Sequence, residues 1–132
     1  MENQKPIILL VEDNSENREV MMHFLRKICD VEIANDGPGA IESAKNNDFA
    51  AILMDINLGL GMNGVEATKK IRSLENHKNT PIVAVTAYAM AGDKETFLAS
   101  GCNYYISKPF TKKEFVSLIE KVLIESGALT IN

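Results

Sequence analysis

Three short runs of consecutive apolar residues divide the chain. Residues 6–11, 50–54 and 82–85 are apolar without a break, and a polar group follows each run. A run this short is typical of a strand buried on both faces of a parallel sheet. Two further strands are predicted. Residues 30–34 alternate polar and apolar, which suits an edge strand with one solvated face, and residues 104–107 form a short fifth strand.

Helical periodicity follows each predicted strand. Three apolar stripes are Met21, Phe24, Leu25 and Ile28; Ala40, Ile41 and Ala44; and Phe115, Leu118, Ile119 and Val122. A helix over about 65–74 is predicted to pack through Val65, Thr68 and Ile71, and a further helix is predicted over about 90–100. Asn14 or Ser15 is the predicted cap of the first helix, and Thr111 with Glu114 forms a capping-box pattern before the last. Gly101 fits the position after the end of the fourth helix.

Five alternating strand–helix units predict an α/β fold. The expected architecture is a doubly wound five-stranded parallel sheet in the order 2-1-3-4-5, with helices on both faces. The alternating second strand belongs at an edge, and the apolar first, third and fourth strands belong inside. We expect a single domain over residues 1–132, with a core from about 6 to 126, because neither a linker nor an internal repeat interrupts the pattern.

Composition and charge exclude several classes of protein. The 132 residues carry a formal net charge of −4, which argues against a nucleic-acid-binding module. No apolar run approaches the roughly 18 residues of a membrane span, and residues 1–6 have no apolar signal core. Cys29 and Cys102 lie far apart and form no metal or redox motif, so we expect packing thiols and a cytoplasmic location.

Polar groups that could perform chemistry stand where four of the five strands end. Glu12 and Asp13 follow the first strand, Asp55 the third, Thr86 ends the fourth, and Lys108 follows the fifth. The carboxyl ends of parallel strands share one edge of the sheet, so these groups should converge. Three close carboxylates repel one another unless a cation lies between them, and Mg²⁺ is the simplest candidate.

This combination predicts phosphoryl transfer with an aspartate nucleophile. Asp55 would attack the phosphorus in line, while Mg²⁺ and Lys108 neutralise charge on the phosphoryl oxygens and the Thr86 hydroxyl donates a hydrogen bond. Each of these residues taken singly has an ordinary structural explanation, such as a strand end or a solvated lysine. Their predicted coincidence at one sheet edge favours the chemical interpretation.

Four motifs at these strand ends carry a family resemblance. They are Val11-Glu12-Asp13-Asn14, Met54-Asp55, Val85-Thr86-Ala87 and Ser107-Lys108-Pro109. Together they resemble the receiver domain of two-component response regulators, over residues 7–123. The resemblance implies a flavodoxin-like (βα)5 fold and a signalling module rather than an enzyme, except that it would catalyse its own phosphorylation and dephosphorylation.

The resemblance also assigns roles around the metal. It implies that Asp55 is the phosphoacceptor and that Asp13 is a direct Mg²⁺ ligand. Asp55 and the backbone carbonyl of Asn57 would be further ligands, and Glu12 would act through water.

Other roles implied by the resemblance concern the switch and the partners. Thr86 and Lys108 would contact the phosphoryl group, and Tyr105 matches an aromatic switch position, although an ordinary edge-strand aromatic remains an alternative. A cis peptide bond is implied at Lys108-Pro109. Residues 86–90 and 101–109 resemble the receivers of hybrid sensor kinases and phosphorelays. The implied phosphodonor is a histidine kinase or a histidine phosphotransfer protein. The implied output is contact with a downstream protein through the fourth helix, fifth strand and last helix, without nucleic acid or membrane.

One segment departs from the family pattern. Gly59 stands where the family usually has a proline, and the matching glycine, Gly64, comes one residue late. The loop 58–62 is therefore expected to be longer and more pliable.

Three alternatives remain open from the residues. The main one is a Mg²⁺-dependent phosphohydrolase with an aspartyl nucleophile, but Asn57 occupies the place where such enzymes carry a second aspartate. A flavin or nucleotide binder needs a phosphate-cradling loop after the first strand, where this chain is acidic. A receiver that acts without phosphorylation has no support from the residues.

The remaining polar candidates are expected on the surface. His23 and His77 are predicted to be solvated and without metal partners, since neither has a second ligand at a suitable spacing. Lys112, Lys113 and Lys121 are predicted to form the solvated face of the last helix.

Overall fold

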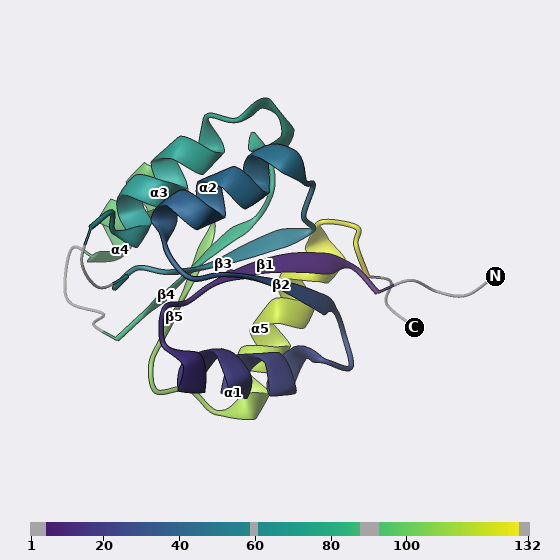
Figure 1. Cartoon of the computed structure of the whole chain (residues 1–132). Coiled ribbons are helices and arrows are strands. Elements are labelled where there is room, and N and C mark those ends of the chain that lie inside the picture. The colour runs from purple at the N-terminus through teal and green to yellow at the C-terminus, as the bar shows by residue number, and fades with distance from the viewer. Residues whose placement is uncertain (1–4, 59–60, 88–92, 130–132) are drawn as a thin grey trace.

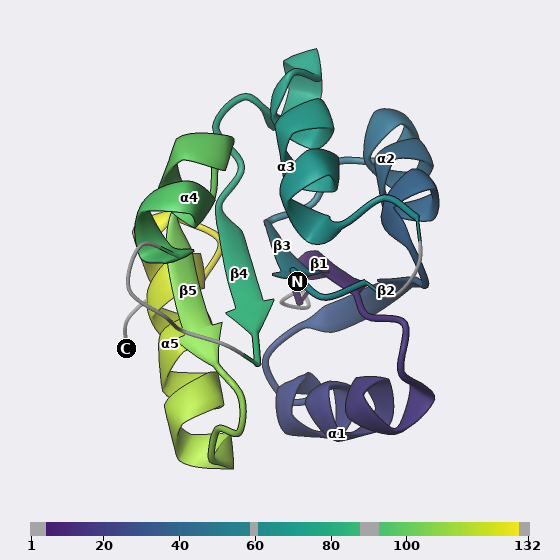
Figure 2. The same cartoon turned by 90° about the vertical axis from the view of Figure 1, so that its left-hand side faces the viewer.

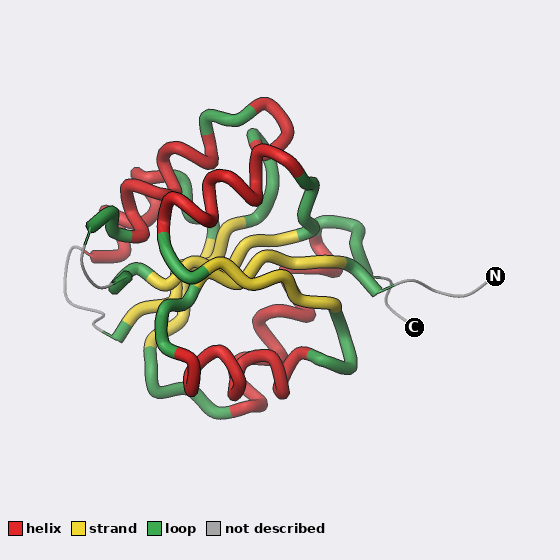
Figure 3. Tube along the Cα trace, in the orientation of Figure 1, coloured by secondary structure: helices red, strands yellow, loops and turns green. Residues whose placement is uncertain are grey.

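The computed structural model describes residues 5–58, 61–87 and 93–129, and within them strands and helices alternate (Figures 1 and 3). The elements are β1 (Ile7–Val11), α1 (Ser15–Leu25), β2 (Asp30–Ala34), α2 (Gly37–Asn46), β3 (Ala51–Asp55), α3 (Gly64–Arg72), a 3-10 turn η1 (Glu75–His77), β4 (Ile82–Thr86), α4 (Asp93–Ser100), β5 (Tyr104–Ser107) and α5 (Lys112–Glu125). The first residues predicted for the fourth helix, 90–92, lie outside the described residues.

The five strands form one parallel sheet in the order β2-β1-β3-β4-β5. Leu10 pairs with Leu53, and Asp55 pairs with Val85. This confirms the predicted order, with the alternating strand β2 at an edge. The crossover between the two halves of the sheet places the ends of β1 and β3 side by side (Figure 2).

Successive residues of the central strands enter two separate cores. Leu9, Ile52 and Ala84 face a core shared with α2, α3 and α4, whereas Leu10, Leu53 and Val85 face a core shared with α1 and α5. Figure 1 shows the two helical layers on opposite faces of the sheet. Both faces are covered, which explains why these strands are uniformly apolar. No helix in the described residues is long and apolar enough to cross a membrane.

The helix ends follow the predicted local signals. The Asn14 side chain caps α1 by accepting a hydrogen bond from the Asn17 N–H. Thr111 and Glu114 form the complete capping box of α5. Gly101 has a φ of +116°, a left-handed conformation that glycine adopts without strain. These caps satisfy backbone groups that the helices cannot satisfy internally.

His77 contradicts the prediction that it lies at the surface. It is completely buried, with its Nε2 3.0 Å from the carbonyl oxygens of both Ala44 and Asn47 and its Nδ1 2.9 Å from the Thr80 hydroxyl. Its ring also stacks on Phe49. The end of α2 needs hydrogen-bond donors for its last carbonyls, and the η1 turn supplies this one from a remote part of the chain. His23 is exposed, as predicted.

Candidate functional site

The carboxyl edge of the sheet gathers the side chains expected there. Glu12 and Asp13 follow β1, Asp55 is the last residue of β3 and Thr86 is the last residue of β4. Lys108 follows β5, and its N–H donates to the Thr86 carbonyl at 2.7 Å. The positions of the strands in the sheet therefore determine where the backbone of each of these residues lies.

Three carboxylates converge at this edge. Glu12, Asp13 and Asp55 each offer an oxygen within 4.8 Å of the other two. Glu12 and Asp55 are buried, at 1% and 3% exposure, while Asp13 is exposed. Anionic oxygens on one exposed and two buried groups suit a hard divalent cation that keeps part of its water shell. The donor set thus fits a metal of the Mg²⁺ type.

Lys108 supplies a cation at the same place. Its ammonium lies 3.0 Å from Glu12 Oε1 and 3.5 Å from Asp55 Oδ2. Lys108 follows β5 and reaches the ends of β1 and β3, neither of which is a neighbour of β5 in the sheet. Its charge partly offsets the repulsion between the two buried carboxylates. The Lys108-Pro109 peptide bond that follows is cis, as the family resemblance implied.

The Asp55 carboxyl group has an unusual affinity for protons. Burial, together with the neighbouring Glu12, raises the pKa of Asp55 to about 7. The Asn57 N–H, which donates to Asp55 Oδ1 at 2.9 Å, and the Lys108 ammonium act in the opposite direction. A carboxylate in this setting gains from any additional cation, so proton and metal compete for it.

Asn57 contacts this site in a way that the sequence did not reveal. Its side-chain Oδ1 accepts long hydrogen bonds from the Thr86 hydroxyl, at 3.5 Å, and from the Ala87 N–H, at 3.4 Å. The family resemblance implied a role only for its backbone carbonyl. Its place two residues after Asp55 was the available signal, but the contact depends on β3 and β4 being neighbours.

Arg18 is a second residue that sequence reasoning missed. Its Nη1 donates to the Glu12 carbonyl at 3.0 Å, so α1 is attached to the end of β1 beside the carboxylates. Glu12 also accepts the Asn14 N–H through its side chain. Arg18 lies outside the apolar stripe of α1, and no local motif marks it.

Tyr105 lies on β5, away from the carboxylates. Its side chain is 38% exposed, and the Lys94 ammonium is 6.0 Å from the centre of its ring. Tyr105 pairs with Ala84 in the sheet, two residues before Thr86. Its role as a switch stays a prediction.

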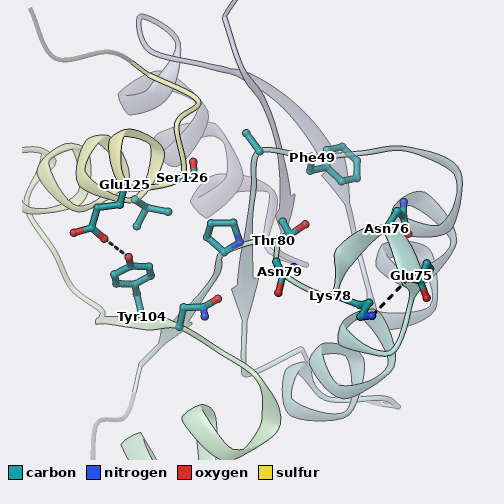
Figure 4. A pocket seen from close by; sticks show the side chains of 13 residues that line it. Phe49, Glu75, Asn76, Lys78, Asn79, Thr80, Tyr104, Glu125 and Ser126 are labelled. Atoms are coloured by element: carbon teal, nitrogen blue, oxygen red, sulfur yellow. Dashed lines mark hydrogen bonds and ion pairs between the residues drawn. The ribbon is translucent and has the colours of Figure 1, made fainter.

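A separate hollow of about 680 Å³ lies at the opposite, amino-terminal edge of the strands (Figure 4). The Tyr104 hydroxyl donates to Glu125 there, and Lys78 pairs with Glu75 at 3.6 Å. These polar side chains bind one another in two separate pairs. The residues predicted to perform chemistry lie at the other edge of the sheet, with Asp55.

Residues 8–120 match the response regulator receiver domain family. The chain belongs to this family. The family resemblance of the four motifs is therefore confirmed, and the chain is a receiver domain of two-component signalling.

Curated relatives are much longer than this chain. Hybrid signal transduction histidine kinase G of Dictyostelium discoideum is 41% identical over 118 residues, which are 86% of this chain and 3% of the kinase. Signal transduction histidine-protein kinase BarA of Escherichia coli is 36% identical over 121 residues, which are 91% of this chain and 13% of BarA. The chain thus spans a small part of each relative.

Solved receivers share the fold closely. The receiver domain of a sensor histidine kinase from Pseudomonas aeruginosa, solved with a magnesium ion coordinated in its active site cleft, is 39% identical, with a TM-score of 0.82. The match covers 90% of this chain and 98% of that one. The chemotaxis response regulator CheY4 of Vibrio cholerae is 29% identical, with a TM-score of 0.85 over 91% of this chain and all of its own.

Proposed function

We propose that this receiver domain is switched by phosphorylation of Asp55. The phosphoryl group would come from a phosphohistidine on a histidine kinase or a histidine phosphotransfer protein, and the reaction would require Mg²⁺. The observation that carries the proposal is the position of Asp55, which lies at the end of a buried strand between two carboxylates and the Lys108 ammonium. The kinase relatives support this class of donor.

Asp55, Lys108 and Thr86 would each have a distinct role in the phosphoryl transfer. An Asp55 carboxylate oxygen attacks the phosphorus in line, and the bond from phosphorus to the histidine nitrogen breaks as the imidazole leaves. Lys108 lies next to Asp55 Oδ2, where its charge stabilises the phosphoryl oxygens. The Thr86 hydroxyl, at the end of the adjacent strand, donates a hydrogen bond to one of those oxygens.

The proposed metal ligands are Asp13, Asp55 and the backbone carbonyl of Asn57, with Glu12 acting through water. Bound Mg²⁺ would neutralise the negative charge on the transferred group. The three converging carboxylate oxygens support this assignment, and so does the magnesium-bound relative from Pseudomonas aeruginosa.

We also propose that the domain catalyses its own slow dephosphorylation. Asn57 is exposed, so water reaches this side of Asp55. The residue two positions after the phosphoacceptor is an amide, which cannot accept a proton from that water as a carboxylate would. The modified state should therefore outlast the transfer reaction, as a signal requires.

Output would pass to a downstream protein through α4, β5 and α5. Tyr105 on β5 and Leu98 on α4 expose apolar surface on these elements, and Lys112, Lys113 and Lys121 on α5 are exposed, as predicted. A phosphoryl group adds roughly two negative charges at the nearby strand ends, to which Thr86 and Tyr105 would respond.

We place this activity in the cytoplasm, in a single domain spanning residues 1–132 with its core over about 6–126.

Intact-mass spectrometry after incubation with acetyl phosphate and Mg²⁺ tests the proposal. The wild type should gain one phosphate, and a chelator should abolish the gain. Asp55→Asn should gain none, whereas the matched control Asp30→Asn, at an exposed aspartate on the opposite edge of the sheet, should behave as the wild type. Modification of Asp55→Asn, or no modification of the wild type with Mg²⁺ bound, would contradict the proposal.

A further inference from the structure

The Asn57 side chain contacts two hydrogen-bond donors at the end of β4, the strand next to that of Asp55. Its Oδ1 accepts from the Thr86 hydroxyl and from the Ala87 N–H, at 3.5 and 3.4 Å. One oxygen atom therefore receives both hydrogen bonds. An oxygen of a phosphoryl group on Asp55 would be an acceptor of the same kind, but with a negative charge.

The backbone of the same residue is attached to the phosphoacceptor. The Asn57 N–H donates to Asp55 Oδ1 at 2.9 Å, a hydrogen bond of ordinary length. Asn57 thus connects Asp55, through its main chain, with Thr86 and Ala87, through its side chain. Any change in the charge of Asp55 occurs within direct reach of this connection.

We propose that the Asn57 side chain is a positioning residue for the switch. In the unphosphorylated domain its Oδ1 holds Thr86 and Ala87, and on phosphorylation it gives up both donors to a phosphoryl oxygen. This inference rests on the proposed phosphorylation of Asp55. The amide side chain would then oppose phosphorylation, so that the unmodified domain stays in its resting arrangement until a phosphodonor acts.

The geometry suits a contact that must break. Hydrogen bonds of 3.4 and 3.5 Å are longer than the usual range and are correspondingly weak. Asn57 is exposed, so its side chain can turn into solvent. A charged phosphoryl oxygen is the stronger acceptor for the same donors. The shorter backbone hydrogen bond to Asp55 can persist while the side chain leaves.

Solvent exchange of the Ala87 amide, measured by NMR on unphosphorylated protein without metal, gives the first test. In Asn57→Ala this amide should exchange about two- to threefold faster, the low end of the range for the loss of a hydrogen bond, because this one is long. In Asn57→Asp it should exchange more slowly, because a carboxylate is a stronger acceptor. The matched control is Asn35→Ala, an exposed asparagine at the same sheet edge with no side-chain contact described, and it should leave the rate unchanged.

Binding of beryllium trifluoride with Mg²⁺, a tetrahedral mimic of a phosphoryl group, gives the second test. Asn57→Ala should bind it about two- to tenfold more tightly than the wild type, since no side chain has to be displaced. At saturation the Ala87 exchange rates of the two proteins should become equal. Equal or weaker binding by Asn57→Ala, or an unchanged Ala87 rate in the free protein, would overturn the role of Asn57. Failure of the wild type itself to bind the mimic would instead contradict the proposed function.

Discussion

The Asp55 carboxyl group is buried beside a second buried carboxylate, that of Glu12, and the Asn57 N–H and the Lys108 ammonium compensate for this only in part. Such an arrangement is unfavourable for folding, because ionised carboxylates lose hydration when they are buried. The same arrangement favours binding of a metal and attack on phosphorus. At the scale of this residue, stability and function therefore have opposite requirements.

The pKa of Asp55 leads to a prediction about stability without metal. The pKa is about 7 in the folded protein and 3.8 ordinarily, so between these values the folded state keeps a proton that the unfolded state has lost. Stability must then fall as pH rises from about 4 to about 7. Relative to Asp55→Asn, the wild type should lose about 2–4 kcal/mol across this window, with little further change above it.

Urea unfolding with a chelator present, from pH 4 to pH 8, measures this difference. Effects of titrating groups that do not interact with Asp55 cancel when the wild type is compared with Asp55→Asn. Asp30→Asn, at an exposed position, should instead run parallel to the wild type. A difference between the wild type and Asp55→Asn that does not depend on pH would disprove the raised pKa.

At the scale of elements, the close approach of α3 to β3 controls the position of the site. Gly64 is the first residue of α3, and a Cβ atom there would lie 2.4 Å from the Asp55 carbonyl oxygen and 2.7 Å from the Ile56 Cα. Only a residue without a side chain permits this contact. Although Gly64 comes one residue later than in the family pattern, it packs against the backbone at the phosphoacceptor.

Gly64→Ala should therefore disturb both folding and phosphorylation. The backbone atoms that the new methyl group meets cannot turn aside, so we expect a loss of about 1–3 kcal/mol in the free energy of unfolding. We also expect slower phosphorylation by acetyl phosphate, since Asp55 must shift. Chemical denaturation and the mass assay measure the two effects.

Gly39→Ala is the matched control. Its Cβ would meet only the Asp36 carboxylate, at 2.9 Å, and that side chain can rotate away at the cost of its helix-capping hydrogen bond. This variant should be phosphorylated at the wild-type rate. If Gly64→Ala did the same, the contact between α3 and β3 would not position the site.

At the scale of the whole molecule, the site lies where the two halves of the sheet meet. Glu12 and Asp13 follow β1, Asp55 ends β3 and Lys108 follows β5, so a ligand at this edge contacts segments that are remote in sequence. The unfolded chain does not keep these groups together. Binding at the edge must then favour the folded state.

Mg²⁺ should accordingly stabilise the fold. At a free concentration a hundredfold above its dissociation constant, the expected gain is about 2.7 kcal/mol. The gain should be larger at pH 8 than at pH 5, because protons and metal compete for Asp55. Thermal unfolding with Mg²⁺ and with a chelator measures it.

Asp13→Asn should remove most of this stabilisation by Mg²⁺, since a neutral amide replaces an exposed anionic ligand. Asp30→Asn should preserve it. Equal stabilisation of the Asp13→Asn variant would show that Asp13 is not a ligand.

The amino-acid sequence by itself determined the elements and the edge at which they act. Short uninterrupted apolar runs are typical of strands covered on both faces, so they indicated β1, β3 and β4, and the polar residue after each run marked the functional edge. Caps such as Thr111 with Glu114 were also predictable, because their hydrogen bonds join residues three apart.

The tertiary structure decided the contacts between segments that are remote in sequence. His77 is buried because the end of α2 lies beside it, and the Asn57 side chain reaches Thr86 because β3 and β4 are neighbours. The pKa of Asp55 likewise depends on burial by several elements at once. Local patterns report the periodicity and ends of each element, but not which groups the packing of those elements brings together.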